Sequence, residues 1–472
     1  MKNIIVVVLG AILIVSAGVG WIVSKRLDLS SPEVKLTPEV TALGAKTTLE
    51  LGLADRGSGI SSVELSITQA GRQVVPFKAD YPVRGLRQGT GVNLQNVFLT
   101  LEPRRLGLAQ GPAQLKVTVR DASWWRMFAG NVTTLERPVQ IDWRPPVVQV
   151  LSGTLYLNQG GAGLVTYKLE EDVAASGVRV GELFFPGYPC PKLGKDVWCA
   201  YLAWPLELAE PPSNVMVIAR DAAGNEGKGG FLYHLRAKSF REDRLELSEE
   251  FLSAMASKLL PADAPAKSPL EGFLEVNRVM RLANHQKIAE ICSTSQPRQL
   301  WQGPFLRLKD TAPMAAFGDR RSYLVGGQEI DRQTHLGVDL ASTAGAAVMA
   351  ANAGQVVYAD ELGIYGQCVI IDHGLGVFSL YAHLSSIESA TGQEVKRGQV
   401  IGRTGATGLA GGDHLHFSML VSGTFVNPIE WWDAHWIKDN IDLKLKQAKE
   451  ALAPPPPLPG PGKRPEVDAV IL

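Results

Sequence analysis

The hydrophobic and polar positions divide this chain into segments of different character. The first is an apolar run from Ile4 to Val23 that contains no charged residue and has basic residues on both sides. As a helix it would reach about 30 Å, enough to cross the hydrocarbon core of a membrane. No clean Ala-x-Ala site follows, so we expect residues 1–26 to be an uncleaved signal anchor, with a cleaved signal peptide as the alternative. The basic flanks do not determine its orientation.

Residues 32–238 show short runs rich in Val, Leu and Thr, separated by Gly, Pro, Asn and Asp. This alternation is typical of strands and turns. Two phrases recur: "ADRGSGI" is echoed by "EDVAASGV", and "LKVTVRDASWW" by "VMVIARDAAGNEG". The repeats predict two β-sandwich domains of immunoglobulin-like size, residues 32–145 and 146–238, joined where Pro145 and Pro146 interrupt any strand. The "RDAAGN" ending resembles bacterial immunoglobulin-like repeats. This resemblance indicates the fold of the domains and does not indicate their function.

A helical pattern follows in residues 239–302, which we expect to form a connector of two helices joined by "PADAPAK". The first of these predicted helices is "REDRLELSEEFLSAMASKLL", in which apolar residues recur at helical spacing. The second helix begins with Ser268 as N-cap, Pro269 at the first helical position and Glu271 two residues later, a capping box. Residues 303–438 are again β-rich with many glycines. Residues 439–472 complete a closing helix and end in a Pro-rich, extended tail.

Composition narrows the class of protein. The chain has 472 residues, too many for one core, and we expect two to four domains. Lys+Arg and Asp+Glu are equal at 47 each, so there is no electrostatic footprint for nucleic acid. The four cysteines form no CxxC pair, which argues against a four-cysteine zinc site. Cys190 and Cys199 form either a disulfide that closes a loop, if the region lies outside the cytoplasm, or two free buried thiols.

The candidate chemistry lies between residues 335 and 416. "THLGVDLAS" contains His335 and Asp339, "LYAHLSS" contains His383, and "GGDHLHFSML" contains His414 and His416. The chain has only 8 histidines, so half of them lie in these three short motifs. On a strand the two histidines of the last motif point to the same face, because side chains alternate with period two. Neutral imidazoles and a carboxylate are the ligands that a catalytic zinc uses, with water in a further position.

The motifs H-x3-D, YAHL and H-x-H, in this order, resemble those of the LytM/lysostaphin-type zinc metallopeptidases, which belong to peptidase family M23. The resemblance extends over about residues 317–428, including "GQVVYADELGIYGQCVIIDHGLGVFSLYAHLSS" and "GQEVKRGQVIGRTGATGLAGGDHLHF". It implies a β-rich catalytic domain with a groove over an antiparallel sheet, a duplicated hybrid motif-like fold. It also implies Zn²⁺ as cofactor and peptidoglycan as substrate.

Carried over by motif, the resemblance implies that His335, Asp339 and His416 bind zinc and that His383 and His414 form the catalytic pair. That division of labour is chemically reasonable, since zinc activates a water and neutral histidines can take its proton or stabilise the oxyanion. The chain has no HExxH motif, so the glutamate base of that other class is absent. Which histidine acts as the base is left open.

Other residues in the region receive structural interpretations. We expect His373 to be structural or to support the site, and Cys368 to be a small buried hydrophobic residue. The glycine-rich "GRTGATGLAGG" lacks a Gly-Lys-Ser/Thr ending, so we expect a flexible groove wall and not a phosphate loop. In "FGDRRSY" one arginine could bind a substrate carboxylate, but a surface salt bridge is the simpler expectation. The histidines outside the motifs are expected to be surface or packing residues, and they are His234, His285 and His435.

These observations favour a membrane-anchored zinc endopeptidase that hydrolyses peptide cross-links of peptidoglycan. The substrate then fixes the orientation: a single pass through the inner membrane, with the bulk of the chain in the periplasm. A diaminopimelate-type cross-link suits that layout. The sandwiches would position the catalytic domain, inhibit it or bind envelope partners. The alternatives are a catalytically inactive scaffold or activator of other wall hydrolases, and an adhesion or partner-binding protein; the complete set of expected ligands favours the enzyme.

Overall fold

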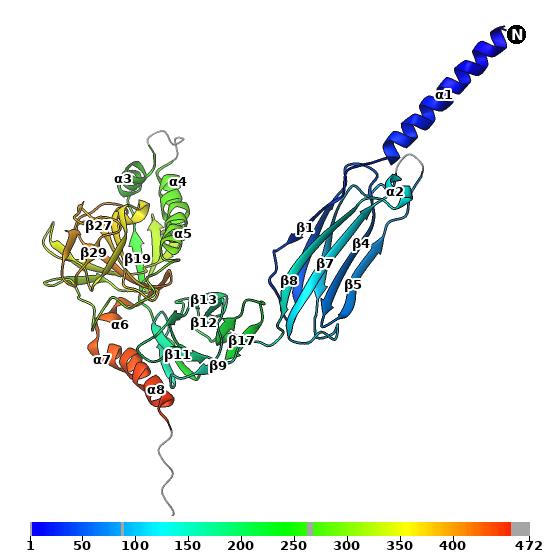
Figure 1. Ribbon diagram of the computed structural model, residues 1–472. Helices are drawn as coiled ribbons and strands as arrows, with labels where there is room; N and C mark the ends of the chain where they lie inside the picture. Colours follow the sequence, from blue (N-terminus) through cyan, green and yellow to red (C-terminus); the bar gives the residue numbers. More distant parts are fainter. Residues whose placement is uncertain (1, 86–88, 262–267, 455–472) are drawn as a thin grey trace, which may run out of the picture. The chain divides into compact units, whose positions relative to one another are not determined.

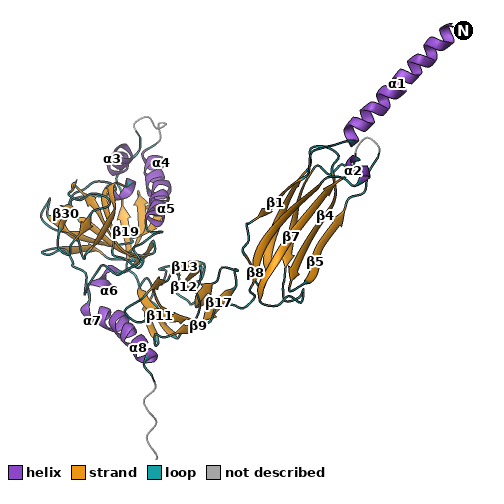
Figure 2. Cartoon of the chain, viewed as in Figure 1, coloured by secondary structure: helices purple, strands orange, loops and turns teal. Residues whose placement is uncertain are grey.

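The computed structural model describes residues 2–85, 89–261 and 268–454, and the chain forms two compact units. The first contains the chain up to Pro146 with Asp172–Ala174 and Ala219–Gly227, and the second contains the remaining segments. Strands dominate both units (Figure 2). The prediction of a mainly β chain with an N-terminal apolar helix is confirmed. The predicted domain boundaries stay predictions.

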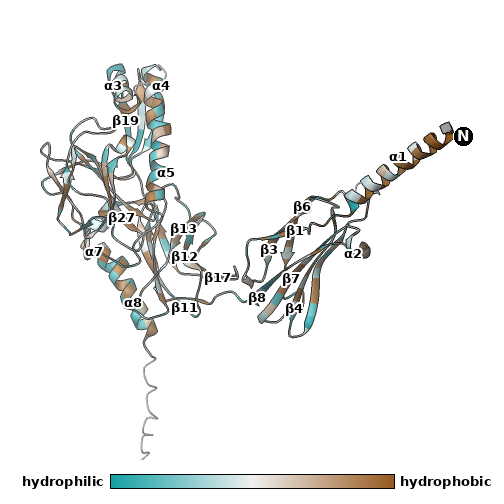
Figure 3. Ribbon diagram, turned by 45° about the horizontal axis from the view of Figure 1, so that its top comes forward, coloured by the Kyte–Doolittle hydropathy of each residue, from teal (hydrophilic) through white to brown (hydrophobic). Residues whose placement is uncertain are grey.

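Helix α1 (Lys2–Arg26) contains the predicted apolar run. Its segment Ile4–Ser24 is long and apolar enough to cross a membrane, and its side chains are exposed in the structure. Figure 3 shows the helix as hydrophobic over most of its length. A side-chain surface that is apolar on all sides suits lipid better than water.

The first unit contains a two-sheet sandwich. Alternate residues of its long strands are fully buried, as in Leu49, Leu51 and Leu53, and they form the core between the sheets. One sheet has the strand order β2 (Ala42–Leu43), β8 (Val132–Ile141), β7 (Gly111–Asp121), β4 (Ile60–Gln69), β5 (Arg72–Asp80). The other has the order β1 (Glu33–Thr37), β3 (Thr47–Ala54), β6 (Leu94–Leu101), and a short helix α2 (Trp125–Phe128) precedes β8.

The next strands form smaller sheets, which Figure 1 shows in cyan to green. One sheet has the order β14 (Tyr188–Pro189), β15 (Val197–Ala203), β11 (Ala162–Leu169), β9 (Val148–Val150). A second has the order β13 (Leu183–Pro186), β12 (Ala175–Val180), β16 (Val215–Arg220), β17 (Glu226–Gly229). The third is the parallel pair β10 (Leu155–Asn158) and β18 (Tyr233–Arg236). Cys190 and Cys199 are both free thiols, so the disulfide alternative is wrong for this structure and the alternative of two free thiols holds. Cys199 is buried on β15, and Cys190 is only partly covered.

The predicted connector is not purely helical. Glu242–Glu246 forms strand β19, which pairs in parallel with β21 (Arg320–Val325), so the helix expected from residue 241 begins only at α3 (Glu249–Leu259). Pairing with a sheet edge outweighed the helical pattern of this short stretch. The second helix has the predicted capping box and runs through α4 (Pro269–Leu274), η1 (Glu275–Met280) and α5 (Arg281–Ile291). Most of the "PADAPAK" joint, residues 262–267, lies outside the described residues.

The C-terminal β domain is built on one antiparallel sheet. Its main path is β20 (Ala312–Ala315), β23 (Val338–Ala341), β31 (Leu415–Val421), β27 (Val377–Leu384), β26 (Gln367–Asp372), β25 (Gly354–Glu361), β29 (Glu394–Val395), with β32 (Thr424–Val426) paired to β31. Two small sheets flank it, with the orders β19, β21, β22 (Gln328–Thr334) and β24 (Ala347–Met349), β30 (Val400–Arg403), β28 (Ser386–Ile387). A short 3-10 helix η2 (Gly363–Tyr365) precedes β26.

One face of this sheet is covered by the helices. Val276 and Ile288 pack with Phe378, Leu380 and Leu420, which alternate along β27 and β31. The predicted closing helix is divided into α6 (Pro428–Trp432), α7 (Ala434–Ile437), η3 (Lys438–Asp442) and α8 (Leu443–Leu452), with Asp433 between the first two. The Pro-rich tail from residue 455 onward lies outside the described residues.

Candidate metal centre and active site

Strand pairing brings the ligand candidates together. Asp339 on β23 lies directly opposite His416 on β31, so both side chains stand on the same face of the sheet. His335 lies in the turn just before β23, and its backbone is tied down because its N–H donates to Asp319 O. All three residues are buried, with exposed fractions of 7%, 8% and 5% for His335, Asp339 and His416.

Three potential ligand atoms converge at hydrogen-bond distances. His335 Nε2 lies 3.0 Å from Asp339 Oδ1 and 3.0 Å from His416 Nδ1, and His416 Nδ1 lies 2.9 Å from Asp339 Oδ1. Zinc–nitrogen and zinc–oxygen bonds of about 2.0–2.2 Å in tetrahedral geometry place neighbouring ligand atoms roughly 3.3 Å apart. The triangle is therefore close to the size that a zinc ion requires.

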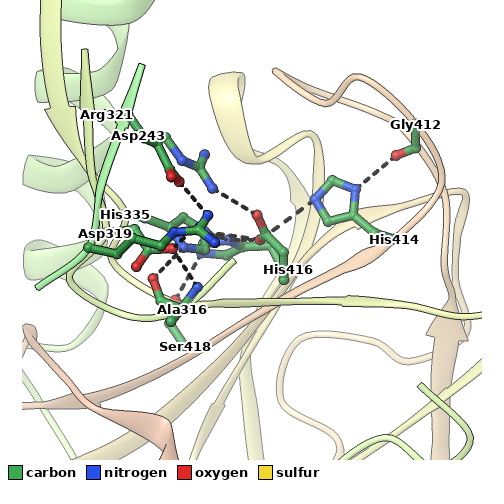
Figure 4. Close-up of polar contacts among 11 residues, drawn as sticks. Asp243, Ala316, Asp319, Arg321, His335, Gly412, His414, His416 and Ser418 are labelled. Atoms are coloured by element: carbon green, nitrogen blue, oxygen red, sulfur yellow. Dashed lines mark hydrogen bonds and ion pairs between the residues drawn. The ribbon is translucent and has the colours of Figure 1, made fainter. Parts of the chain in front are cut away.

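The hydrogen-bond network fixes which ring nitrogens carry hydrogen (Figure 4). His335 Nδ1 lies 3.0 Å from Ala316 O, a pure acceptor, so Nδ1 is the N–H donor and Nε2 has a lone pair. Ser418 Oγ donates to Leu336 O at 2.8 Å, so it accepts from His416 Nε2–H at 3.0 Å. His416 Nδ1 therefore also has a lone pair. Three lone-pair atoms that face one another repel unless a cation lies between them, and these donors fit a zinc ion.

The electrostatics of these residues agree with that assignment. Burial lowers the pKa of His416 to about 4, so the ring is neutral at physiological pH, as a metal ligand must be. Burial by itself would raise the pKa of Asp339. Ring N–H groups of His335 and His416 directed at the carboxylate outweigh burial and hold the pKa of Asp339 well below its usual value; with their lone pairs facing inward, a bound cation would take over that role.

His383 reaches the site through an unusual backbone conformation. Its neighbour Ala382 lies opposite His416, so regular alternation would direct His383 to the other face. Its φ of +62° breaks the alternation, and its ring centroid lies 5.7 Å from that of His416. Such a conformation is costly for a residue other than glycine. His383 Nδ1 lies 2.9 Å from Thr407 O, so Nδ1 carries the hydrogen and Nε2 has a lone pair. Burial lowers the pKa of His383 to about 3.

His414 stands beside His383 at the mouth of the site. The two ring centroids are 4.8 Å apart, and His414 Nε2 lies 3.6 Å from Asp339 Oδ1. Its Nδ1 donates to Gly412 O at 2.8 Å, so Nε2 is the ring nitrogen that faces the site (Figure 4). The structure thus brings together all five residues singled out from the sequence. Three direct potential ligand atoms to one point, and the other two place their rings beside it.

Two residues for which the sequence suggested roles outside the site also line the surrounding cavity, Arg321 and His285. Arg321 is not a surface salt bridge: it donates from Nη2 to Asp339 Oδ2 at 3.2 Å. His285 on α5 packs near Tyr365 and Phe425, as expected for a packing residue, but it also lines the cavity, with Nε2 unpartnered among the described residues. The sequence pattern could not predict either contact, because Arg321 lies on β21 and His285 on α5, which are separate elements from those that carry the site motifs.

The cavity measures about 250 Å³ and is closed on one side by β19, α3, α4 and α5. Leu247, Phe251 and Phe273 supply its apolar wall, and Leu409 of the glycine-rich loop packs on the same cluster and also lines the cavity, as does Gly411. The loop thus lines the groove as predicted; its flexibility stays a prediction. Ser418, two residues after His416, was missed, although period-two alternation places it on the same face.

The remaining predicted residues lie away from this centre. His373 is fully buried, with Nδ1 2.8 Å from Ala353 O and Nε2 2.7 Å from Ser379 Oγ, a structural role as predicted. Cys368 is fully buried in the core, also as predicted. His234 stacks on Tyr156, and His435 is exposed after α6.

Gly337 is required by close approach to the same centre. A Cβ atom at this position would lie 2.6 Å from His416 Nε2 and 2.6 Å from Ser418 Oγ. Any side chain would displace the ring or the serine that holds it. The glycine in "HLGVD" therefore belongs to the architecture of the site.

Comparison with known proteins places this site in a described family. Residues 333–428 match the model of Peptidase family M23. The DD-carboxypeptidase/endopeptidase Mpg of Neisseria meningitidis is 42% identical over 95 residues, 20% of this chain and 22% of that protein. The murein hydrolase activator NlpD of Salmonella dublin is 32% identical over 177 residues, 37% of this chain and 42% of that protein. The matches thus span less than half the length of these relatives.

A chain described as a putative peptidase M23 from Pseudomonas aeruginosa aligns with 58% of this chain and 95% of its own length, at 22% identity and a TM-score of 0.37.

Proposed function

Because the C-terminal part of this chain is a Peptidase family M23 domain, we propose that the protein is a zinc-dependent endopeptidase that hydrolyses peptide cross-links of peptidoglycan. The observation that carries the proposal is the set of three converging ligand atoms on His335, Asp339 and His416, beside the rings of His383 and His414. The similarity to Mpg, named as a DD-carboxypeptidase/endopeptidase, favours this substrate class.

The roles follow from the contacts of each side chain. His335 Nε2, Asp339 Oδ1 and His416 Nδ1 would hold the ion, and the carbonyl of Ala316 and the hydroxyl of Ser418 would hold the two rings in the required tautomers. When bound, zinc lowers the pKa of a water toward neutrality and polarises the scissile carbonyl.

His383 and His414 would perform the proton transfers. Each ring donates from Nδ1 to a backbone carbonyl and keeps a lone pair on Nε2, so either can accept the proton of the attacking water. The ring that carries the proton can then donate it to the oxyanion or to the leaving amine. The apolar wall from α3 and α4 would exclude water from the groove.

The location follows from the substrate. Peptidoglycan lies outside the cytoplasmic membrane, so α1 would act as a single-pass anchor in the inner membrane, with the sandwiches and the peptidase domain in the periplasm. The sandwiches would position the domain or bind envelope partners.

The test uses the full-length chain in detergent with purified peptidoglycan, and mass spectrometry of the soluble products. We expect cleavage that stops with a chelator, returns with zinc, and is lost in His335→Ala and His383→Ala. His435→Ala, an exposed histidine outside the site, is the matched control and should cleave normally. Cleavage that persists in both site variants, or that is insensitive to the chelator, would refute the proposal.

A second candidate function is activation of another wall hydrolase, which the similarity to NlpD favours. An activator needs the fold of the groove but not its ligands, whereas this chain has the complete set. The two functions are distinguished by adding the protein to a separate wall hydrolase. Stimulation that survives His335→Ala, with no cleavage by the chain itself, would identify an activator.

A further inference from the structure

A second cluster of potential ligands lies in the first unit, far along the chain from the histidines. Asp28, Asp55 and Asp121 each offer a carboxylate oxygen, and these three oxygens lie within 4.8 Å of one another. Asp28 follows α1, Asp55 follows β3, and Asp121 ends β7. The cluster is therefore made by three separate segments that meet at the end of the sandwich where α1 joins it (Figure 1).

Two of the carboxylates are well supplied with hydrogen-bond donors. Asp121 accepts from Ser123 N at 3.0 Å and from Asn131 N at 2.7 Å through Oδ1, and from Asn131 Nδ2 at 2.8 Å through Oδ2. Asp28 accepts from Ser30 N at 2.9 Å and from Ser58 N at 3.2 Å. Asp28 Oδ1 also accepts from Ser30 Oγ. These donors fix the positions of the carboxylates and occupy both lone pairs of each Oδ1, but they leave a lone pair on Oδ2 of Asp28 and of Asp121.

Asp55 is different, and it points to a missing ligand. It is only 4% exposed; its Oδ2 accepts from Gly57 N and Gly59 N, at 3.2 Å and 2.5 Å. Its Oδ1 is buried and has no hydrogen-bond partner among the described residues. An ionised oxygen that is buried without a donor or cation is among the most costly arrangements in a folded protein.

Within the part of the chain that the structure describes, no cation forms an ion pair with the carboxylates of the cluster. Burial and, to a lesser extent, the proximity of Asp28 and Asp121 raise the pKa of Asp55. Arg26 is the nearest candidate for compensation along the chain, and it is 3% exposed. It donates from Nη2 to Gly85 O, and among the residues that the structure describes it forms no ion pair with these carboxylates.

We propose that Asp28, Asp55 and Asp121 bind one Ca²⁺ ion. The ligand set consists of hard carboxylate oxygens without nitrogen or sulfur, which suits Ca²⁺ and excludes a preference for zinc. A divalent ion would occupy the position that Asp55 Oδ1 faces and would offset the repulsion between the three carboxylates. Sites of this kind in extracellular modules bind with dissociation constants of about 10⁻⁴–10⁻³ M.

The same segments explain what the ion would do. Asn131 Nδ2 donates to Asp28 O at 2.9 Å and to Ser30 O at 3.0 Å, so the chain that leaves α1 is already clasped to the sandwich. Gly57 lies against this segment, because a Cβ atom there would meet Asp28 Oδ2 at 1.7 Å. Ca²⁺ would cross-link Asp28 to the β3–β4 turn and to the end of β7, and so stiffen the junction between α1 and the first sandwich.

The hydrogen bonds of Asn131 recur at a second asparagine, which provides an internal comparison. Asn225 Nδ2 donates to Asp142 O at 2.8 Å, to Arg144 O at 3.3 Å and to Asp221 Oδ2 at 2.7 Å, the same pattern as in Asn131. Among the described residues no third carboxylate completes this copy into a ligand group. The same asparagine contacts are therefore present in a copy where the described residues do not bring three carboxylates together.

The experiment is calorimetric titration of the full-length chain in detergent, freed of metal with EGTA, with CaCl₂ and separately with MgCl₂. We expect one Ca²⁺ per chain, weaker binding of Mg²⁺, and a loss of at least tenfold in Ca²⁺ affinity in Asp55→Asn. Asp80→Asn removes an exposed carboxylate of the same sandwich and should bind as the parent does. Thermal unfolding with and without Ca²⁺ should show a stabilised first unit in the parent and in Asp80→Asn, but not in Asp55→Asn.

The outcomes are separable from those of the peptidase test, because the residues lie in different units. If Asp55→Asn misfolds, Asp28→Asn, which is less buried, gives the same comparison. No Ca²⁺ binding by the parent chain, or binding that is unchanged in both variants, would overturn the proposal.

Discussion

Ser418 offers a sharp test of how the site is organised, because it touches a proposed ligand without being one. Its Oγ accepts from His416 Nε2–H at 3.0 Å and is itself fully buried. In the Ser418→Ala variant, that N–H has no acceptor whenever His416 presents its Nδ1 lone pair to a metal. Without metal the ring can change tautomer and donate from Nδ1 to Asp339 Oδ1, 2.9 Å away. The cost therefore falls on the metal-bound state.

The magnitude follows from the cost of leaving a buried donor unpaired, about 1–3 kcal/mol. Since about 1.4 kcal/mol corresponds to a factor of ten, zinc affinity should fall roughly 10- to 100-fold, the range found for lost supporting contacts in metal sites. The assay is competition for zinc with a chromophoric chelator at neutral pH, with thermal unfolding to verify that the variant is folded.

The matched control is Ser379→Ala on the neighbouring strand. Ser379 is equally buried and lies 2.7 Å from His373 Nε2, but that histidine does not face the metal centre. We expect its zinc affinity to stay within about threefold of the parent, well inside the loss expected for a supporting contact. Parent-like affinity in Ser418→Ala, or an equal loss in Ser379→Ala, would refute the tautomer argument.

Three further predictions concern catalysis, packing and pH. His383→Ala and His414→Ala should each lower the rate of cleavage by about 10²–10⁴-fold while zinc affinity changes little, and a parallel loss of zinc would contradict their separation from the ligands. Gly337→Ala should abolish stoichiometric zinc binding, because its Cβ would lie 2.6 Å from His416 Nε2; chelator competition that gives the parent affinity would contradict the close approach. Burial raises the folded pKa of Glu430 to about 7, above the ordinary 4.5, so the folded state holds the extra proton and stability is lost as pH rises between these values. Chemical unfolding should show this loss, on the order of 3 kcal/mol, in the parent but not in Glu430→Gln, and identical pH profiles would exclude it.

The sequence alone determined the residue types and most of their local relations. Motifs with histidine and aspartate at short spacing contain the five side chains that the structure brings together; their roles as zinc ligands and proton carriers stay a prediction. The two-residue spacing of His414 and His416 placed them on one side of a strand, and Ser268 with Glu271 marked the start of a helix. The alternating pattern in β3 and β7 indicated a sandwich because burial on one face imposes period two.

Tertiary structure decided the relations between distant segments. The register of β23 against β31 places Asp339 opposite His416, and the φ of +62° turns His383 into the site against its strand's alternation. Arg321 and His285 enter the cavity from a neighbouring sheet and a helix, and β19 forms because an edge strand was available to pair with it. Such contacts depend on which elements pack together, and a local pattern of hydrophobic and polar residues does not encode that choice.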